Sequence, residues 1–427
     1  MEITRTSDYD RLLARHHAMR LRRQILAPST APGPAGPGAV GDGGGGGGGG
    51  GGYEGGCDGG RDQRTILRHL DLVTPFDGLI AQLYDAMFRR RPYMRRLFPA
   101  SMAFQQEHLA RMFTYLIENL HRPDHLTAVL EQLGRDHRKL GVWPAHYGAF
   151  EEALREALRG RAGHGWTAQA EQAWLRMLRF AVRAMVGGAE SAMTEPPYWH
   201  GLVVAHERRA SDLAVLYVRT GEEYPYRAGQ YASLESPLLP HTWRQYSVAC
   251  APRADHVLEF HVRRSGPGGV SEALVDGTGV GDSLRLGPPR GTLTPDGDPR
   301  DLLLVAQDTG AAPMKAILED LSGGRRARGQ RVRLYVGAGS RADLYEWDTL
   351  AALGAARPWL DLAPVLPVAP AATADLAGAL EGRDWSEHSA FVSGPPAVLD
   401  AVRARLLASG MPAERIRQDP AAGHGRG

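Results

Sequence analysis

The chain has 427 residues, which suggests about three domains, and its 50 basic and 48 acidic side chains leave a formal net charge of only +2. Its positive residues are scattered among acids, so the composition indicates neither a nucleic-acid partner nor a charged membrane surface. The two cysteines, Cys57 and Cys250, are far apart, which argues against a disulfide scaffold, a cysteine zinc site and a CxxC redox centre. The sequence also lacks a bilayer-length apolar run and a signal-peptide core, so we expect a cytoplasmic protein.

Residues 1–62 carry no signal of a packed domain. Residues 8–26 are rich in Arg and Leu and predict a short basic helix, and an unbroken glycine run follows at residues 43–52. Such a run gains too few contacts to offset its ordering entropy, so we interpret it as a flexible linker. The basic helix either docks on a partner or an anionic surface, or is solvated. We predict a disordered tail over residues 1–62.

Helical periodicity runs through residues 63–195 without a strand signal, which predicts an all-α domain. One of its helices is bounded by Asp124, a potential cap, and by Gly141, which can end it. His137 lies on the apolar face of this helix. A histidine inside a core must satisfy its ring nitrogens by hydrogen bonds or by binding a ligand. The rest of this face consists of Leu126, Val129, Leu130 and Leu133.

Three further polar residues, Tyr84, Gln105 and Tyr147, interrupt the apolar faces of the other helices. Together with His137 they suggest a shared ligand, since none has an obvious charged partner. A flat apolar cofactor with a central metal fits, because a histidine can hold the metal while a tyrosine and a glutamine donate hydrogen bonds opposite it. A helical core with scattered hydrogen-bonded polar groups is the alternative, and the pattern alone leaves both open.

Residues 65–194 resemble the globin domain of bacterial flavohaemoglobins. The resemblance lies in the phrases LYDAMFRRRPYMRRLFP, QQEHL, IENL and DHRKLGVWPAHY, and in the late Trp174. It implies that His137 is the proximal ligand of haem b and that Tyr84 is the distal tyrosine beside bound O2. It also implies that Gln105 is the distal glutamine, with Gln106 as the alternative. The resemblance further implies a haem pocket that includes Phe98 and Leu109.

On the proximal side, the resemblance pairs Tyr147 with a glutamate of the last helix. Glu190 is the candidate, although it lies one residue from the expected place. An acceptor on the free N–H of the histidine raises the electron density at iron, which favours O2 activation. Asp136 departs from the family, in which a lysine is common, and if its side chain faces the flavin domain the contacts at the haem–flavin junction must differ.

Short β-rich runs separated by Gly, Pro and Asp fill residues 196–298 and predict an antiparallel β-barrel. In the motif RQYS, residues 244–247, a strand can present a guanidinium to a phosphate, an aromatic ring to a flat heterocycle, and a hydroxyl to a ring nitrogen. With RAGQY before it and GGVSEAL after it, this motif resembles the FAD domain of the ferredoxin-reductase superfamily. The expected strands are residues 202–206, 213–218, 231–234, 244–248, 257–262 and 283–286.

This second resemblance implies bound FAD. It assigns two groups of residues to the cofactor, one at the flavin and its phosphate and one at the pyrophosphate, where glycines and a serine at a helix start form a nest. The first group is Tyr231, Arg244, Gln245, Tyr246 and Ser247, and the second is Gly269, Val270 and Ser271.

Strands alternate with helices in residues 299–420, which predicts a doubly wound α/β domain with a parallel sheet, followed by a flexible C-terminus, residues 421–427. The expected strands are residues 302–306, 332–336, 362–366 and 391–392. The expected helices are residues 312–321, 343–353 and 397–409.

The segment LLLVAQDTGAAPMKAIL, residues 302–318, is a strand, a glycine turn and a helix, an arrangement that binds phosphate. The family usually has two glycines where this chain has Gln307 and Asp308. An acid near a pyrophosphate is unfavourable unless it points away. The residues that the resemblance assigns to NAD(P) are Thr309, Gly310, Pro313, Arg341, Tyr345, Ser393, Gly394 and Pro395.

The nicotinamide end carries further departures. Tyr345 is expected to pack beside adenine, whereas Arg341 either meets a 2′-phosphate or is a solvated surface residue, so NADH and NADPH both remain open. Ser393 replaces the cysteine of the family's Cys-Gly-Pro. The closing aromatic residue that covers the flavin in the family has no counterpart in RIRQDPAAGHGRG, so other residues cover the flavin or its face is more open.

The domain order suggests the function. A hydride donor delivers two electrons, a flavin separates them, and a haem accepts one at a time. We therefore expect a flavohaemoprotein that oxidises nitric oxide to nitrate with O2, with electrons passing from NAD(P)H to FAD to haem. The alternatives are an NAD(P)H oxidase or ferric reductase, and a globin sensor of O2 or NO with a weakened reductase. The expected partners are the small molecules O2 and NO, without nucleic acid or an integral membrane span, and the expected state is a monomer.

Overall fold

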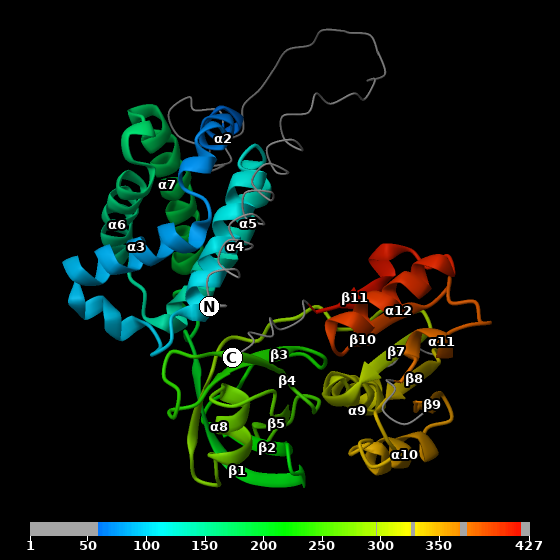
Figure 1. Cartoon of the computed structure of the whole chain (residues 1–427). Helices are drawn as coiled ribbons and strands as arrows, with labels where there is room; N and C mark the ends of the chain where they lie inside the picture. Colours follow the sequence, from blue (N-terminus) through cyan, green and yellow to red (C-terminus); the bar gives the residue numbers. More distant parts are fainter. Residues whose placement is uncertain (1–58, 296, 326–328, 368–373, 420–427) are drawn as a thin grey trace, which may run out of the picture. The chain divides into compact units, whose positions relative to one another are not determined.

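The structure, a computed structural model, describes residues 59–295, 297–325, 329–367 and 374–419. It divides into two compact units, residues 1–195 and 196–427 (Figure 1). The expected basic helix, the glycine run and the C-terminal residues 421–427 lie outside the described residues. No helix in the described ranges combines the length and the apolarity that crossing a bilayer requires.

The first unit is built from helices joined by short turns, so the all-α prediction is confirmed. Its core is formed by the apolar faces of these helices and has Trp174, Phe113 and Leu83 at its centre, each at most 2% exposed. The helices are α2 (Gly59–Arg68), α3 (Phe76–Arg90), α4 (Ala103–Asn119), α5 (Pro123–His137), α6 (Pro144–Ala162) and α7 (Ala168–Ser191), and the turns are η1 (Leu70–Leu72), η2 (Pro92–Leu97), η3 (Arg138–Leu140) and η4 (Gly163–Gly165).

The first helix begins earlier than the sequence suggested. The predicted tail extends to residue 62, but α2 already begins at Gly59. Asp62 is buried and accepts two hydrogen bonds from Arg176 on α7, at 2.9 and 2.6 Å. This ion pair fixes the first turn of α2 to the last helix, and a contact across more than a hundred residues leaves no local pattern in the sequence.

Helix α5, which carries His137, differs from its prediction at one end only. Pro123 is its first residue, so Asp124 lies within the first turn instead of capping it, where its charge still complements the helix dipole. At the other end Gly141 has φ 72° and terminates the short turn η3 that follows α5. The helical run thus stops at this glycine as expected, although α5 itself ends at His137.

Helices α5 and α7 cross at two glycines. A Cβ on Gly134 of α5 would collide with the backbone carbonyl of Met185, and one on Gly188 of α7 with that of Glu131. The absence of both Cβ atoms lets the two backbones touch. The crossing lies one turn before His137, so it fixes the position of that side chain.

The first half of the second unit is the antiparallel sheet that the spacing of short β-rich runs predicted. The bridge between Val248, just after β4, and Phe260 of β5 brings its two edge strands together, so the sheet closes into the expected barrel. Its strands pair in the order β4-β3-β6-β1-β2-β5, and helix α8 (Val270–Asp276) packs against it. The buried faces of these strands enclose Phe260, Leu216 and Leu286. The strands are β1 (Trp199–Ala210), β2 (Leu213–Thr220), β3 (Tyr231–Glu235), β4 (Arg244–Ser247), β5 (Val257–Arg263) and β6 (Ser283–Leu286).

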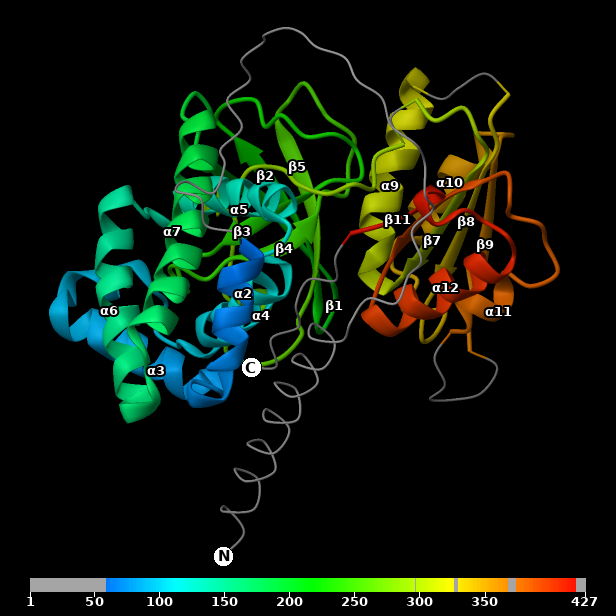
Figure 2. The same ribbon diagram turned by 90° about the horizontal axis from the view of Figure 1, so that it is seen from above.

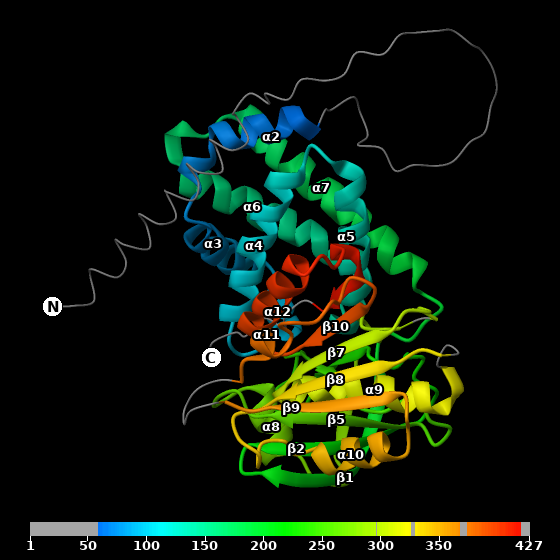
Figure 3. The same cartoon turned by 90° about the vertical axis from the view of Figure 1, so that its right-hand side faces the viewer.

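The second half is a parallel sheet in the order β11-β10-β7-β8-β9, with helices on both faces (Figures 2 and 3). Successive residues of β7 enter different cores: Leu302 and Leu304 face one cluster, and Leu303 and Val305 face the other. Burial on both faces explains the unbroken apolar run of this strand. The strands are β7 (Leu302–Gln307), β8 (Val332–Gly337), β9 (Leu360–Val365), β10 (Ser389–Ser393) and β11 (Ile416–Gln418), and the helices are α9 (Ala311–Asp320), α10 (Trp347–Ala355), α11 (Leu376–Ala379) and α12 (Pro396–Ala408).

The fold class is thus confirmed: a helical domain, an antiparallel sheet and a doubly wound parallel sheet follow one another. Strand β11 was not predicted. It has three residues and pairs only with β10 at the edge of the sheet. Helix α10 begins at Trp347 and not at residue 343, because Asp343 accepts a hydrogen bond from Ser340 Oγ at 2.7 Å in the preceding turn.

A buried carboxylate between α6 and α7 provides a test of the helical unit. Glu171 is 7% exposed and accepts hydrogen bonds from Arg159 at 2.6 and 2.7 Å, which hold its pKa below the ordinary 4.5. Its charged form therefore stabilises the folded state above pH 4.5, and this contribution is lost as the pH falls through the lowered pKa. We expect Glu171→Gln to lower the melting temperature at pH 7 by about 2–5 °C.

The melting temperatures of Glu171→Gln and the parent should converge below pH 4.5, as followed by circular dichroism. Glu152→Gln, at an exposed position of α6, is the matched control and should show no such convergence. A gap for Glu171→Gln that stays constant down to pH 3 would contradict the assignment.

Candidate functional site

His137 ends helix α5 with one ring nitrogen already bonded. Its Nδ1 lies 2.8 Å from the backbone carbonyl oxygen of Leu133, one turn earlier. Since a carbonyl only accepts, Nδ1 carries the proton and the Nε2 lone pair is directed away from the helix. Burial lowers the pKa of His137, although the Leu133 carbonyl opposes this shift. A neutral imidazole with its Nε2 lone pair available is the form that binds a metal.

Tyr84 on α3 is a second buried polar group of the same unit. It is 8% exposed, and burial raises its pKa to about 12. Its ring packs edge-on against Phe98 at 5.5 Å and stacks on Phe88 at 5.9 Å between centroids. The hydroxyl therefore stays neutral at physiological pH, so it can donate a hydrogen bond.

Gln105 on α4 presents a polar atom without an internal partner. Its Oε1 is buried, and among the described residues no group donates a hydrogen bond to it. A buried amide oxygen left in this state carries a desolvation cost of about 1–3 kcal/mol. A bound group or a water molecule would provide the missing hydrogen bond.

The remaining residues expected around this site lie at different depths. Tyr147 on α6 is half-buried, and burial raises its pKa to about 12. Phe98 and Leu109 are half-buried and pack against the helical core. Glu190 is exposed near the end of α7, so its role beside the histidine stays a prediction. The orientation of His137 and the unsatisfied Gln105 amide fit a flat apolar group whose metal is held by the histidine.

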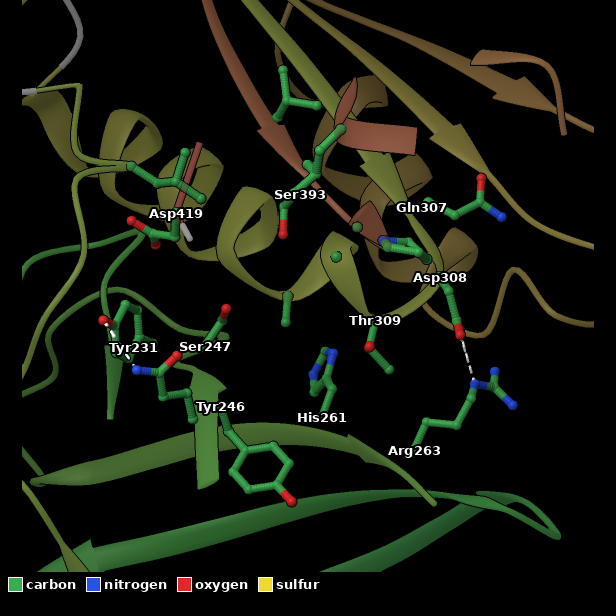
Figure 4. Close-up of a pocket in the computed structure, with 18 of the residues that line it drawn as sticks. Tyr231, Tyr246, Ser247, His261, Arg263, Gln307, Asp308, Thr309, Ser393 and Asp419 are labelled. Carbon is green, nitrogen blue, oxygen red and sulfur yellow. Dashed lines mark hydrogen bonds and ion pairs between the residues drawn. The ribbon is translucent and has the colours of Figure 1, made fainter. Parts of the chain in front are cut away.

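The second unit contains a cavity of about 290 Å³ between its two sheets. It lies at the carboxyl ends of β7 and β10, where the chain order of the parallel sheet reverses, and ligands of doubly wound folds bind at such a switch point. Side chains from both halves line it, among them Ser247 from β4 and Ser393 from β10 (Figure 4).

This cavity brings together many of the residues expected to bind FAD and NAD(P). From the barrel it is lined by Tyr231, Gln245, Tyr246 and Ser247. From the parallel sheet it is lined by Thr309, Gly310, Ser393, Gly394 and Pro395. A Cβ on Gly310 would collide with the carbonyl of Ser393, so this glycine lets the turn after β7 approach the turn after β10.

Other expected residues lie outside this lining. Burial lowers the pKa of Arg244, which begins β4, although its proximity to Tyr246 opposes this shift. Ser271 accepts a hydrogen bond at 3.1 Å from the backbone N–H of Ser265, a cavity residue, so the start of α8 adjoins the cavity. The remaining members are Gly269 before α8, Val270 within it, Pro313 buried in α9, Arg341 exposed after β8, and Tyr345.

Strand β5 contributes three side chains that the sequence analysis missed. Glu259, His261 and Arg263 alternate along the strand and therefore project from one face; they are called the β5 row below. An acid, a histidine and an arginine at every second position of a strand was the available signal. The intervening residues are the buried Leu258, Phe260 and Val262.

The β5 row connects the barrel to three segments of the parallel domain. The contacts are made with α9, with the loop after β8 and with the turn after β7. Glu259 Oε2 lies 2.9 Å from Lys315 Nζ, His261 Nδ1 lies 2.8 Å from the hydroxyl of Tyr345, and Arg263 Nε lies 2.8 Å from Asp308 Oδ2. The hydroxyl of Tyr345, expected beside adenine, is therefore bonded to the barrel.

The contact between Glu259 and Lys315 is a buried ion pair. Burial raises the pKa of Glu259, but His261 and Lys315 outweigh this effect and hold the pKa below its ordinary value. Burial lowers the pKa of Lys315, but Glu259 and Glu319 outweigh it and raise the pKa. Both residues are 5% exposed, so removing either one would deprive a buried charge of one of its partners, which costs free energy.

Asp308 and Asp419 place two carboxylates in the cavity lining. Figure 4 shows that the Asp308 carboxylate is directed toward Arg263. An acid is tolerated in this turn because this arginine neutralises its charge. Asp419 follows β11, and its Oδ1 accepts a hydrogen bond at 2.7 Å from the backbone N–H of Thr292. Burial raises the pKa of Asp419. A carboxylate thus lies near the point where the family's closing aromatic residue was expected and not found.

Comparisons with known proteins agree with this division. The globin family matches residues 81–185, and the oxidoreductase FAD-binding domain family matches residues 201–294. The crystal structure of a flavohemoglobin from Malassezia yamatoensis, with bound FAD and heme, covers 84% of this chain and 98% of its own, with a TM-score of 0.68 and 17% identity. At this identity the likeness establishes the fold alone.

Among curated relatives, the flavohemoprotein of Bacillus subtilis is 25% identical over 259 residues, which cover 56% of this chain and 64% of the relative. The flavohemoprotein of Bordetella pertussis is 28% identical over 306 residues, 66% of this chain and 75% of the relative. A ferredoxin–NAD(P)(+) reductase component of the naphthalene 1,2-dioxygenase system of Pseudomonas putida is 30% identical over 226 residues, 51% of this chain and 67% of the relative. The chain thus spans less than two thirds of the Bacillus subtilis relative. The chain therefore joins a globin domain to an FAD-binding reductase domain, and in this it is similar to the flavohemoproteins.

Proposed function

We propose that this chain oxidises nitric oxide to nitrate with O2 and NAD(P)H, using haem b, FAD and NADH or NADPH. The observation that carries the proposal is the combination within one chain of two sites. One holds a neutral histidine with its Nε2 lone pair available, together with buried polar groups. The other is a reductase cavity at the switch point of a doubly wound sheet. The flavohemoprotein relatives support this reading. A cytoplasmic location and a monomeric state belong to the same proposal.

When bound, haem supplies the iron at which O2 and NO meet, and FAD converts the two electrons of a hydride into single electrons. His137 would hold the iron through Nε2, with its ring fixed by the Leu133 carbonyl. Tyr84 would donate a hydrogen bond from its neutral hydroxyl into the distal side of the pocket, and the Gln105 amide would provide a second polar contact there. Polar groups placed in this way would stabilise negative charge that develops beside them.

Other residues would complete the haem pocket. Phe98 and Leu109 contribute apolar surface that keeps water away from the distal side. Tyr147 and Glu190 are proposed to act on the proximal side, where Tyr147 is half-buried and protonated.

In the reductase, one group of residues would bind the cofactor FAD and another would bind the substrate NAD(P)H. The aromatic rings of Tyr231 and Tyr246 would pack on the flavin, with the Gln245 amide and the Ser247 hydroxyl at its polar edge. Arg244 and the turn before α8, residues 269–271, would hold the phosphates of FAD. The NAD(P)H nicotinamide would lie beside Ser393, Gly394 and Pro395, and its phosphates beside Thr309 and Gly310, with Pro313 holding the helix start. Arg341 and Tyr345 would bound the adenosine end.

The proposal is tested by mixing the reduced holoprotein with O2 and NO in a stopped-flow instrument and measuring nitrate. We expect nitrate to form in step with NADH or NADPH consumption, well above the rate without protein. Haem and FAD incorporation without nitrate would reject the dioxygenase and leave the oxidase or ferric-reductase alternative. Flavin reduction that is slow with both NADH and NADPH would favour the sensor alternative.

A first variant tests the iron ligand. His137→Ala should abolish haem incorporation while flavin content remains unchanged, because the two sites lie in separate units. His125→Ala is the matched control, since this histidine lies on the same helix but is exposed and bonds Tyr115 at 2.8 Å. The Soret-to-flavin absorbance ratio measures both. Full haem content in His137→Ala would exclude the assignment.

A second variant tests the distal hydrogen bond. Tyr84→Phe should accelerate O2 dissociation by about 10- to 100-fold, the range expected when a hydrogen bond to a charged group is removed. Flash photolysis of the reduced protein measures this rate. Tyr115→Phe on α4, whose hydroxyl bonds His125, should leave the rate unchanged. Equal rates in Tyr84→Phe and the parent would place the O2 contact elsewhere.

A further inference from the structure

The turn after β7 has an unusual residue at its most constrained position. Asp308 has φ 54°, in the left-handed region that side chains other than glycine seldom adopt. Aspartate is among the side chains that tolerate this conformation best, so the contacts of its carboxylate indicate its role in the turn. Asp308 is held by an ion pair 2.8 Å long with Arg263 of the β5 row, which joins the parallel-sheet domain to the barrel.

Arg263 is shared between two carboxylates. Besides Asp308, it contacts Asp212, whose Oδ1 and Oδ2 lie 2.8 and 2.7 Å from Nη1. Burial lowers the pKa of Arg263, but the two acids outweigh this effect and raise it. One guanidinium and two carboxylates leave this cluster with a net charge of −1 at neutral pH.

The two carboxylates differ in position. Asp308 and Arg263 both line the cavity, beside Thr309 and Gly310 of the phosphate-binding turn, whereas Asp212 is not part of that lining. The guanidinium therefore has one partner on the ligand side and one behind it. Arg264 also lines the cavity, but it is paired at 2.8 Å with Asp276, likewise outside the lining.

Arginine recognises phosphate by the same bidentate geometry with which it recognises carboxylate. A dinucleotide whose phosphates enter this turn meets a carboxylate of like charge, and the guanidinium that would receive them is already bonded to it. Arg263 and Asp308 are 24% and 33% exposed, so solvent reaches both and the pair can exchange partners.

We propose that Asp308 is an internal competitor for the nucleotide phosphates, and that Arg263 is the cation for which the two compete. Dinucleotide binding then requires Arg263 to exchange Asp308 for a phosphate, while Asp212 holds the guanidinium from behind. Competition from Asp308 thus makes the affinity for the nicotinamide dinucleotide lower than it would be without this carboxylate. This inference rests on the proposed function only in taking a nicotinamide dinucleotide as the donor.

The test measures binding without turnover. The FAD- and haem-loaded protein is titrated with ADP-ribose, which carries the pyrophosphate but no nicotinamide, and with adenosine, which carries no phosphate. Isothermal calorimetry gives both dissociation constants. Asp308→Asn is the central variant, because asparagine tolerates a left-handed backbone and removes only the charge.

We expect Asp308→Asn to bind ADP-ribose about 3- to 10-fold more tightly than the parent, in line with the strength of a partly exposed charge pair. Adenosine binding should not change. Arg263→Gln should weaken ADP-ribose binding by about threefold or more, and Arg263→Gln combined with Asp308→Asn should lose the tightening. Asp212→Asn is the matched control: it removes a charge from the same arginine outside the cavity and should have a smaller effect than Asp308→Asn.

Unchanged or weaker ADP-ribose binding in Asp308→Asn would overturn the proposal. Equal tightening with and without Arg263 would also overturn it, since simple repulsion would then suffice. If the asparagine variant loses FAD, ADP-ribose binding is measured with Asp308→Gly instead, which removes the charge and accepts the left-handed backbone without a side chain. Because no step involves O2 or NO, failure of the dioxygenase assay would leave these binding results fully interpretable.

Discussion

The buried ion pair between Lys315 and Glu259 is the contact on which the reductase cavity depends. Lys315 Nζ also donates to the backbone carbonyl of Ala249 at 3.2 Å, so two hydrogen bonds at one atom attach helix α9 to the barrel, and a third, to Glu319 at 2.7 Å, lies within α9. Desolvating these charges costs free energy, and an apolar pair of the same volume would be as stable or more so. Unlike an apolar contact, hydrogen bonds between charged groups require a defined geometry. An ammonium bonded to two oxygens of the barrel fixes α9, and with it the turn after β7, relative to the barrel.

The elements of the fold could be predicted because each follows from a local period. Apolar residues three and four apart predicted the helices, and Phe260 and Leu258 lie in a run typical of a buried strand. The cavity could be anticipated in part for the same reason, since RQYS and the turn after β7 are contiguous motifs. The pairing of Arg263 with Asp308 could not. The two residues are 45 positions apart, and from the sequence alone each is expected to be an ordinary solvated surface residue. Only the fold brings β5 beside the turn. Strand β11 was missed because three residues at a sheet edge have no detectable period.

In the helical unit, too, some features of the site follow from local sequence and others depend on the fold. The orientation of His137 is local, since its hydrogen-bond partner is the carbonyl one turn earlier on its own helix. The relation between Tyr84 on α3 and Gln105 on α4 is not local, and the sequence linked them only as polar residues on apolar faces and through the family resemblance. Glu190 illustrates the sensitivity of helices to phase: one residue changes the direction of a side chain by about 100°, and this glutamate is exposed. The glycine crossing of α5 and α7 was invisible in sequence, because Gly134 and Gly188 are meaningful only in contact with each other's helix.

The two acids of the reductase cavity argue for an altered nucleotide site and against a lost one. Asp308 stands where the family has glycine, and it is compensated by an arginine from another domain. Asp419 is compensated by a backbone N–H and the hydroxyl of Thr292, with the backbone bond at 2.7 Å. A cavity that no longer bound a ligand would have no need of a carboxylate in this turn. The Asp308 carboxylate is held by a cross-domain ion pair in the cavity lining, which a bound phosphate is suited to break. This combination favours a site whose affinity is set by competition within the protein.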